Sequence, residues 1–159
     1  MNAFKTLGGI LRNKYLGHKV PIAVTMAVTY RCTLRCRYCR IWKKAGEEMT
    51  TRQVLAAIDE LAEAGTCRLG ITGGEPLLRH DIGTIVARAK ERDLFTTVFT
   101  NGTLVPDHLD TLKRLDTVLM SLDGPAEIHD KMRGDGSHAK AMHALALMAS
   151  AGIKVWTNT

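Results

Sequence analysis

Two repeat distances organise the hydrophobic and polar residues of this chain. Apolar positions alternate with small or polar ones around Val24, Met26 and Val28, which is the period-two pattern of a β-strand. Short segments rich in β-branched, aromatic or other apolar residues recur four more times along the chain. The pattern predicts five strands, at residues 22–29, 68–72, 95–100, 118–122 and 153–157.

Between these segments, apolar residues recur at the spacing of an amphipathic helix. Asp81 is placed to cap a helix whose apolar positions repeat at i, i+3, i+4 and i+7 from residue 82. Thr50 and Gln53 form a capping-box pattern before another helix, and Gly65 is placed to end that helix in the left-handed conformation. Further helices are predicted over residues 106–115 and 137–151, and a short amphipathic helix packed on the domain is predicted over residues 4–16.

Strands and helices therefore alternate along the chain, which predicts an α/β fold with a parallel sheet and right-handed crossovers. The 159 residues correspond to one domain, and no linker, low-complexity tract or sequence repeat divides them. We expect residues 1–20 to form the N-terminal helix and lead-in, and residues 21–159 to form the core domain.

Polar residues and glycines gather where the predicted strands end. The first strand leads into a loop with three cysteines, and the next three lead into residues 72–76 (TGGEP), 100–102 (TNG) and 121–125 (SLDGP). Each segment taken singly is also compatible with an ordinary turn or helix cap. Because parallel strands end at one common edge, where α/β folds bind ligands, their coincidence predicts a binding site there.

Cys32, Cys36 and Cys39 form a CxxxCxxC motif directly after the first predicted strand. Three thiolates this close in sequence can ligate three irons of a [4Fe–4S] cluster and leave the fourth iron open for chemistry. A zinc site is the alternative, but it requires a fourth ligand, which would have to come from a distant residue such as His80. Cys67 precedes an apolar segment on its own and is predicted to be a core residue.

Composition and charge narrow the functional classes. The longest nearly apolar stretch, residues 20–28, is too short to span a membrane, and the N-terminus lacks the apolar core of a signal peptide. We therefore expect a cytoplasmic protein with reduced thiols. The net charge is +6, but the basic residues are spread along the chain and aromatic residues are few. This distribution argues against a dedicated nucleic-acid surface.

The cysteine motif followed by GGEP resembles the radical S-adenosylmethionine superfamily. The resemblance begins near residue 22 and continues to the end of the chain. It includes residues 129–134 (HDKMRG), which are similar to the HDxxRG stretch of the branch containing molybdopterin-precursor synthase and the PqqE-like maturases. The resemblance implies a partial (β/α) barrel of the TIM type, with a [4Fe–4S] cluster and S-adenosyl-L-methionine as cofactors. Since the family's barrel continues beyond a fifth strand, we expect a fragment or a shortened barrel whose open sheet edge permits association.

By the same resemblance, residues at the strand ends bind the cofactors. The metal ligands are Cys32, Cys36 and Cys39, and the cofactor-binding residues are Tyr38, Gly73, Gly74, Glu75, Pro76, Asn101, Ser121, Asp123 and Arg133. Residues 73–76 should cradle the methionine amino group, and Tyr38 should lie near the adenine. Ser121 and Asp123 should contact the ribose or the methionyl part, and Arg133 should pair with the carboxylate.

The resemblance also implies the reaction, a reductive cleavage of S-adenosylmethionine to a 5′-deoxyadenosyl radical that abstracts hydrogen from the substrate. The implied partners are a reductant such as flavodoxin or ferredoxin, and a substrate that is a peptide, a cofactor precursor or a small metabolite. His129 and Asp130 are predicted to be a solvated pair on a loop, without a catalytic role. The alternative function is a non-catalytic metal-binding module, holding zinc or a degenerate iron–sulfur site, that makes protein contacts.

Overall fold

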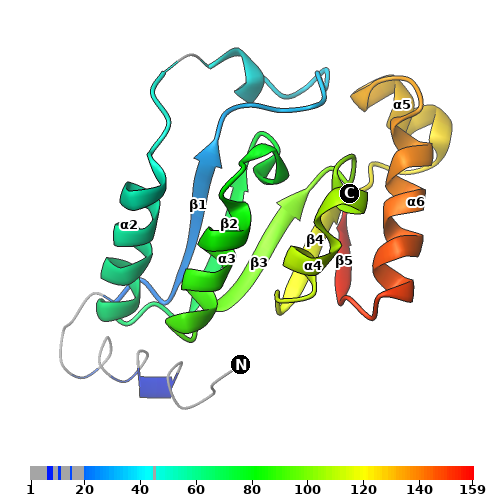
Figure 1. Cartoon of the computed structure of the whole chain (residues 1–159). Helices are drawn as coiled ribbons and strands as arrows, with labels where there is room; N and C mark the ends of the chain where they lie inside the picture. Colours follow the sequence, from blue (N-terminus) through cyan, green and yellow to red (C-terminus); the bar gives the residue numbers. More distant parts are fainter. Residues whose placement is uncertain (1–6, 9–10, 12–14, 16–19, 45) are drawn as a thin grey trace.

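The computed structural model describes residues 7, 8, 11, 15, 20–44 and 46–159. Its centre is a sheet of five strands that lie side by side in the order in which they occur along the chain (Figure 1). All neighbouring pairs are parallel. The strands are β1 (Ala23–Thr29), β2 (Arg68–Gly73), β3 (Phe95–Thr100), β4 (Thr117–Ser121) and β5 (Val155–Asn158). The α/β class and the five predicted strands are confirmed.

Helices connect successive strands, and right-handed crossovers between strands in chain order place such helices on the same face of the sheet. Figure 1 shows α3 and α4 in front of the strands, with α2 beside β1 and α6 beside β5. The α-helices are α2 (Thr51–Glu63), α3 (Ile82–Glu91), α4 (Leu109–Leu112), α5 (Ala126–Arg133) and α6 (Ser137–Ser150). The described residues also form three short 3-10 turns: η1 (Ile41–Lys43), η2 (Pro76–Leu78) and η3 (Val105–His108).

The hydrophobic core lies between the sheet and these helices. Ile71 and Val98 from the strands join Ile58, Val86 and Met148 from the helices in one cluster, and all five side chains are fully buried. Burial of this apolar surface is the main stabilising contribution to the fold. Packing against the helices therefore holds the sheet, and with it the ends of the strands, in place.

The predicted start and end of α2 are confirmed, whereas a later helix is shorter than predicted. Thr50 and Gln53 make the reciprocal capping-box bonds at the start of α2, with Gln53 N donating to Thr50 Oγ1 at 3.3 Å and Thr50 N donating to Gln53 Oε1 at 2.8 Å. Gly65 follows the end of α2 with a φ of +97°, which favours glycine. The helix predicted over 106–115 is shorter, because a 3-10 turn precedes the single turn of α4.

The expected cap at Asp81 is wrong, although Asp81 does occupy the position before α3. Its carboxylate accepts hydrogen bonds from Arg79 Nε at 2.7 Å and from Arg79 Nη2 at 2.6 Å, and it makes no cap bond. Both residues are buried. The hydrogen bonds from Arg79 lower the pKa of Asp81 to about 2, so the carboxylate is ionised at neutral pH. Asp81 therefore binds the buried guanidinium of Arg79 rather than the backbone N–H groups at the start of α3.

The prediction of a solvated His129–Asp130 loop is also wrong. The segment forms α5, and His129 is only 1% exposed. The Asp130 carboxylate accepts hydrogen bonds from the backbone nitrogens of Gly136 (3.1 Å) and His138 (2.7 Å) at the start of α6. Asp130 therefore satisfies helix amides that would otherwise lack partners.

The helix predicted over residues 4–16 falls largely outside the described residues. The four positions of it that are described, Leu7, Gly8, Leu11 and Tyr15, are helical. Its packing against the domain stays a prediction, as does the division at residue 20. Within the described part of the chain, no helix combines the length and apolar character needed to cross a membrane.

Candidate functional site

A pocket of about 260 Å³ lies at the carboxyl edge of the sheet. Every strand contributes to it, either through its last residues or through the loop that follows. The lining residues are Cys32, Cys36, Tyr38, Cys39, Ile41, Thr72, Gly73, Gly74, Phe99, Thr100, Asn101, Ser121, Arg133 and Asn158. The expectation that polar strand ends meet at one edge is confirmed.

The pocket gathers nine of the twelve residues that the sequence proposed for the site, including all three cysteines of the motif. The other three, Glu75, Pro76 and Asp123, are not among its lining residues. Glu75 is fully buried, Pro76 begins the turn η2, and Asp123 bonds to residues that do line the pocket. Glu75 and Asp123 therefore support the pocket from behind its surface, through hydrogen bonds to lining residues.

The cysteine loop follows the end of β1 and lies at the carboxyl edge of the sheet. Cys32 Sγ lies 3.5 Å from Leu34 N and 3.7 Å from Asn101 Nδ2, so two N–H groups point at this sulfur. Cys39 N donates to Cys36 O at 3.2 Å, and Arg37 N donates to Met132 O on α5 at 2.9 Å. The loop is thus held both internally and against α5.

The donor set suits an iron–sulfur cluster. Hydrogen bonds to cysteine sulfur are among the features that tune such clusters, and Cys32 receives two. Burial raises the pKa of the Cys32 and Cys36 thiols, and the positive charge of Arg133 opposes this for Cys36. A metal must displace these thiol protons in order to bind, so binding releases protons and strengthens as the pH rises. No three His, Cys, Asp or Glu side chains among the described residues are grouped to hold a single metal ion. In a cluster, each cysteine binds a different iron, so the sulfurs need not converge on one point.

Gly73 and Gly74 let the end of β2 lie directly against the start of the cysteine loop. A Cβ atom on Gly73 would overlap the carbonyl oxygen of Thr29, and one on Gly74 would overlap that of Arg31. With no side chain in the way, Gly74 N donates to Thr29 O and Glu75 N donates to Arg31 O, both at 2.8 Å. These two glycines therefore allow a close approach of the backbone to the cysteine loop.

The Glu75 carboxylate binds protein donors rather than facing the pocket. Its Oε1 accepts from Leu77 N at 3.2 Å and from Thr100 Oγ1 at 2.9 Å, and its Oε2 accepts from Asn101 N at 2.8 Å. Burial raises the pKa of Glu75, and these three hydrogen bonds oppose that shift. Glu75 thereby joins the ends of β2 and β3.

Asn101 extends this connection to the cysteine loop. Its Nδ2 donates to Thr33 Oγ1 at 3.0 Å and points at the Cys32 sulfur, while its Oδ1 accepts from Thr103 N at 3.0 Å. Hydrogen bonds therefore run from Glu75 through Asn101 to the first cysteine. These hydrogen bonds link the buried Glu75 carboxylate to a metal-ligand candidate.

Arg133 makes a two-point ion pair with Asp123 on the far side of the pocket. Arg133 Nε and Nη2 each lie 2.7 Å from a different carboxylate oxygen, and Tyr38 Oη donates to the same carboxylate at 3.1 Å. His129 Nδ1 accepts from Asp123 N at 3.1 Å, which holds the backbone of Asp123 in place. Burial raises the pKa of Tyr38 to about 12, so its hydroxyl keeps the proton it donates. In this structure, Arg133 has a protein carboxylate as its partner.

Sequence reasoning missed Ile41 and Phe99 as pocket residues. Phe99 also lines a separate hollow of about 410 Å³ on the sheet face. It is the one residue that both lining sets share, so it forms a floor between the two spaces. The alternation of Phe95, Thr97 and Phe99 with buried neighbours on β3 was a usable signal for this orientation.

Comparison with known proteins shows where these features recur. The sequence model of the radical SAM superfamily matches residues 26–159. A PqqA peptide cyclase from Granulibacter bethesdensis is 32% identical over 148 residues, which cover 87% of this chain and 39% of that protein. A mycofactocin maturase from Mycobacterium ulcerans is 37% identical over 142 residues, covering 86% and 38%. An Fe-coproporphyrin III synthase from Methanosarcina barkeri is 37% identical over 144 residues, covering 86% and 36%.

Solved structures share the fold at low sequence identity. Streptococcus suis SuiB bound to S-adenosylmethionine superposes with a TM-score of 0.80 at 19% identity, covering 92% of this chain and 36% of that one. The enzyme anSMEcpe with AdoMet and the Kp18Cys peptide gives 0.74 at 20% identity, covering 85% and 42%. This chain thus spans well under half the length of the relatives that it matches.

Proposed function

The chain belongs to the radical SAM superfamily, and from that membership we propose that it is the cofactor-binding core of an enzyme that cleaves S-adenosylmethionine reductively. When bound, the [4Fe–4S] cluster and S-adenosylmethionine supply a one-electron cleavage that yields methionine and a 5′-deoxyadenosyl radical for hydrogen abstraction. The chain's own residues hold these partners close together and exclude water and stray hydrogen donors.

One observation carries the proposal: three cysteines line the pocket, and the fourth cysteine lies elsewhere. Cys67 directly precedes β2, so it lies at the opposite edge of the sheet from the pocket. Cys32, Cys36 and Cys39 would therefore supply three ligands to a four-iron cluster. The remaining iron is then available to the amino and carboxylate groups of S-adenosylmethionine.

We assign the rest of the pocket to S-adenosylmethionine. The backbone at Gly73 and Gly74 is the proposed acceptor for the amino group, and Tyr38, which lines the pocket, is proposed to contact the adenine. Ser121 is proposed to contact the ribose or methionyl part, and Arg133 to pair with the carboxylate. Asn101 borders the same pocket. Glu75 and Asp123 would then act by positioning these groups through the hydrogen bonds that they make to lining residues.

We propose a peptide as the substrate class. Among the relatives, the PqqA peptide cyclase acts by name on a peptide, and one SuiB structure is bound to the precursor peptide SuiA. Other relatives are an Fe-coproporphyrin III synthase and an AdoMet-dependent heme synthase, so a cofactor precursor is the competing class.

The proposed function predicts a defined cofactor content and product. Anaerobically reconstituted protein should be brown and contain about four irons and as much sulfide per chain. Reduction in the presence of S-adenosylmethionine should then release 5′-deoxyadenosine, which chromatography measures. A colourless protein with one zinc per chain would contradict the proposal and support a non-catalytic metal-binding module. Iron uptake without 5′-deoxyadenosine would contradict cleavage by this chain and indicate a degenerate or truncated barrel.

We further propose that an acidic electron carrier, such as a flavodoxin or ferredoxin, docks on the outer side of the cysteine loop. Residues 31–44 include six basic residues and no acidic ones. All six basic side chains are exposed: Arg31, Arg35, Arg37, Arg40, Lys43 and Lys44. Arg35 and Lys43 lie 4.7 Å and 5.1 Å from the centre of the Trp42 ring, which orders these two cations.

Electrostatic docking predicts a salt-dependent reduction rate. The rate constant for reduction by reduced flavodoxin should fall about tenfold or more as ionic strength rises through the physiological range, because screening removes the steering field. Replacing Lys43 and Lys44 with glutamate should cause a similar loss at low salt, whereas Lys140→Glu on α6 should have little effect. Stopped-flow spectroscopy measures these rates. Equal losses in both variants would contradict docking at this loop.

A further inference from the structure

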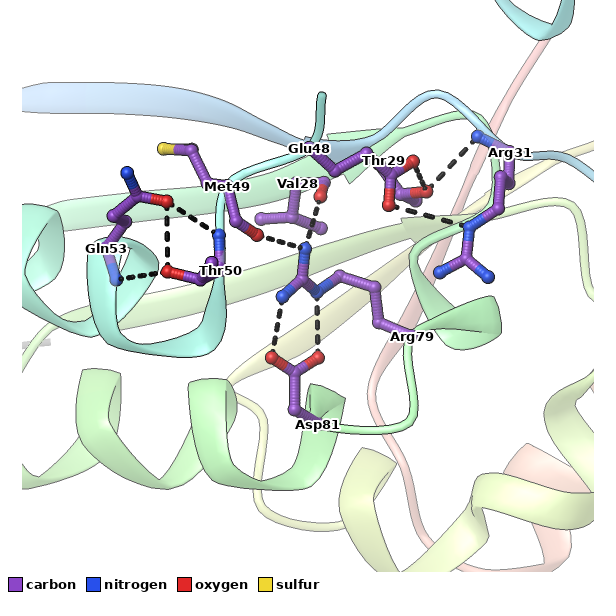
Figure 2. A network of polar contacts seen from close by, with 9 residues as sticks. All are labelled: Val28, Thr29, Arg31, Glu48, Met49, Thr50, Gln53, Arg79 and Asp81. Carbon is purple, nitrogen blue, oxygen red and sulfur yellow. Dashed lines mark hydrogen bonds and ion pairs between the residues drawn. The ribbon is translucent and has the colours of Figure 1, made fainter. Parts of the chain in front are cut away.

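A segment of three residues, Thr29 to Arg31, joins the end of β1 to the first cysteine, and it is bonded on two sides. On one side, Gly74 N and Glu75 N donate to Thr29 O and Arg31 O. On the other side lies the carboxylate of Glu48, from the connection between η1 and α2 (Figure 2).

The Glu48 carboxylate contacts each residue of the segment. Glu48 Oε1 accepts from Thr29 Oγ1 at 2.5 Å and from Tyr30 N at 2.9 Å, and Glu48 Oε2 lies 3.5 Å from Arg31 Nε. Partial burial would raise the pKa of Glu48, but the hydrogen bonds from Thr29 and Tyr30 and the charge of Arg31 hold it below the ordinary value. The carboxylate is therefore charged when it binds the segment.

Glu48 is itself anchored by a buried arginine. Arg79 Nη1 donates to Met49 O at 3.0 Å and to Val28 O at 2.8 Å, and it thus ties the residue after Glu48 to the end of β1. The other nitrogens of Arg79 bind the Asp81 carboxylate, as Figure 2 shows. Thr50 then starts α2 with its capping box. The two residues that follow Glu48 are therefore held by hydrogen bonds, which places its side chain beside the segment.

We infer that Glu48 is a positioning residue for the cysteine loop, and that the buried Arg79–Asp81 pair holds it in register. The inference rests on the proposed function, since it concerns the loop that would carry the cluster. Glu48 touches no cysteine, yet its contacts end one residue before Cys32. Outer residues that orient metal ligands typically change metal affinity by about 10- to 100-fold when they are removed.

A purely stabilising role is the competing explanation, and burial separates the two. The Glu48 side chain is 23% exposed, so its removal opens no core cavity. The expected consequence is freedom at the entry to the loop rather than unfolding of the sheet. Retention of the cluster should therefore change much more than the melting temperature.

The test compares iron retention in the wild-type chain, Glu48→Ala, Glu48→Gln and Glu47→Ala. Glu47 is the exposed neighbour and provides a control of equal charge. After anaerobic reconstitution, iron loss to an added chelator is followed by absorbance, and thermal unfolding is recorded for each protein without the cluster. We expect Glu48→Ala to lose iron about 10- to 100-fold faster than the wild type. Glu48→Gln should retain iron nearly as well as the wild type, because its amide oxygen still accepts from Thr29 and Tyr30. Glu47→Ala should match the wild type.

Wild-type retention in Glu48→Ala, or an equal loss in Glu47→Ala, would overturn the positioning role. The positioning role would also be overturned if Glu48→Ala and Glu48→Gln both lost melting temperature and iron retention in parallel. That result would favour a general structural role. If Glu48→Ala cannot be isolated folded, Glu48→Gln and Glu48→Asp replace it. The shorter aspartate keeps the charge but loses reach, so it should lose iron faster than the glutamine variant. A wild-type chain that binds no iron and sulfide would contradict the proposed function itself.

Discussion

Replacing Cys36 with alanine is expected to abolish cluster binding and S-adenosylmethionine cleavage together. Two remaining thiolates cannot hold a cubane that needs a ligand on each of three irons. Iron should fall from about four per chain to the background of the unreconstituted protein, and 5′-deoxyadenosine should fall below detection. Cys36 is buried beside its partners in the pocket wall, so solvent cannot readily supply a substitute ligand at the same place.

Cys67 provides the matched control for this substitution. It is as buried as Cys36, at 8% exposure for both, but it lies before β2 at the opposite edge of the sheet. Cys67→Ala should therefore cost about 1 kcal/mol of stability and leave iron and product formation intact. Elemental analysis and chromatography check both variants. Unchanged iron in Cys36→Ala, or loss of iron in Cys67→Ala, would refute the ligand assignment.

Glu75→Ala is expected to produce the largest loss of stability. The substitution leaves three buried donors without their acceptor, namely Leu77 N, Asn101 N and the Thr100 hydroxyl. Each unsatisfied buried donor costs about 1–3 kcal/mol, and the relief of desolvating a buried carboxylate offsets part of this. We expect a net loss of about 3–5 kcal/mol in the free energy of unfolding, measured by urea denaturation.

A conservative substitution at Glu75 separates the charge from the shape. In Glu75→Gln, the amide oxygen can keep two of the three bonds, but its NH₂ group then faces Asn101 N, which is also a donor. The expected loss is about 1–3 kcal/mol. Glu60→Ala on the exposed side of α2 should change stability by less than about 0.5 kcal/mol. Wild-type stability in Glu75→Ala would show that the carboxylate does not join β2 to β3.

Cys36→Ala and Glu75→Ala should affect the site in different ways. Cys36→Ala removes a candidate ligand and leaves the sheet intact. Glu75→Ala acts through Asn101, whose backbone nitrogen it releases and whose side chain points at the Cys32 sulfur. The alanine variant at position 75 should therefore also weaken iron retention, and the loss should track the loss of stability.

Local sequence pattern was sufficient for the five strands and for the edge at which the site lies. Strand alternation reflects which side of a strand faces the core, and that constraint acts within a few residues. The position of the cysteine motif directly after β1 followed from the same pattern. The pattern did not predict α5. The charged and polar residues of that segment form a helix, and its buried residue His129 accepts a hydrogen bond from the backbone N–H of Asp123.

Side-chain roles in the site depended on residues far apart in the chain. Glu75 was expected to face a ligand, but two of its three donors, the Thr100 hydroxyl and Asn101 N, lie at the end of β3, about one strand–helix unit later. Asp81 was expected to cap α3, but its carboxylate binds Arg79, two residues earlier, and Arg79 is itself bonded to the distant carbonyl oxygens of Val28 and Met49. Buried donors of this kind replace the local hydrogen bonds that the sequence pattern predicts, because burial strengthens a hydrogen bond to a charged group.

By itself, the sequence determined the α/β class, the order of the elements, the three cysteines and the common edge of the sheet. These features follow from periodicity and spacing, which act over short distances along the chain. Only the tertiary structure decided which carboxylates support the site from within, which residue floors the pocket, and that Glu48 contacts the entry to the cysteine loop. The physical reason is that a polar side chain binds the donor or acceptor that folding brings to it, and chain distance does not reveal that partner.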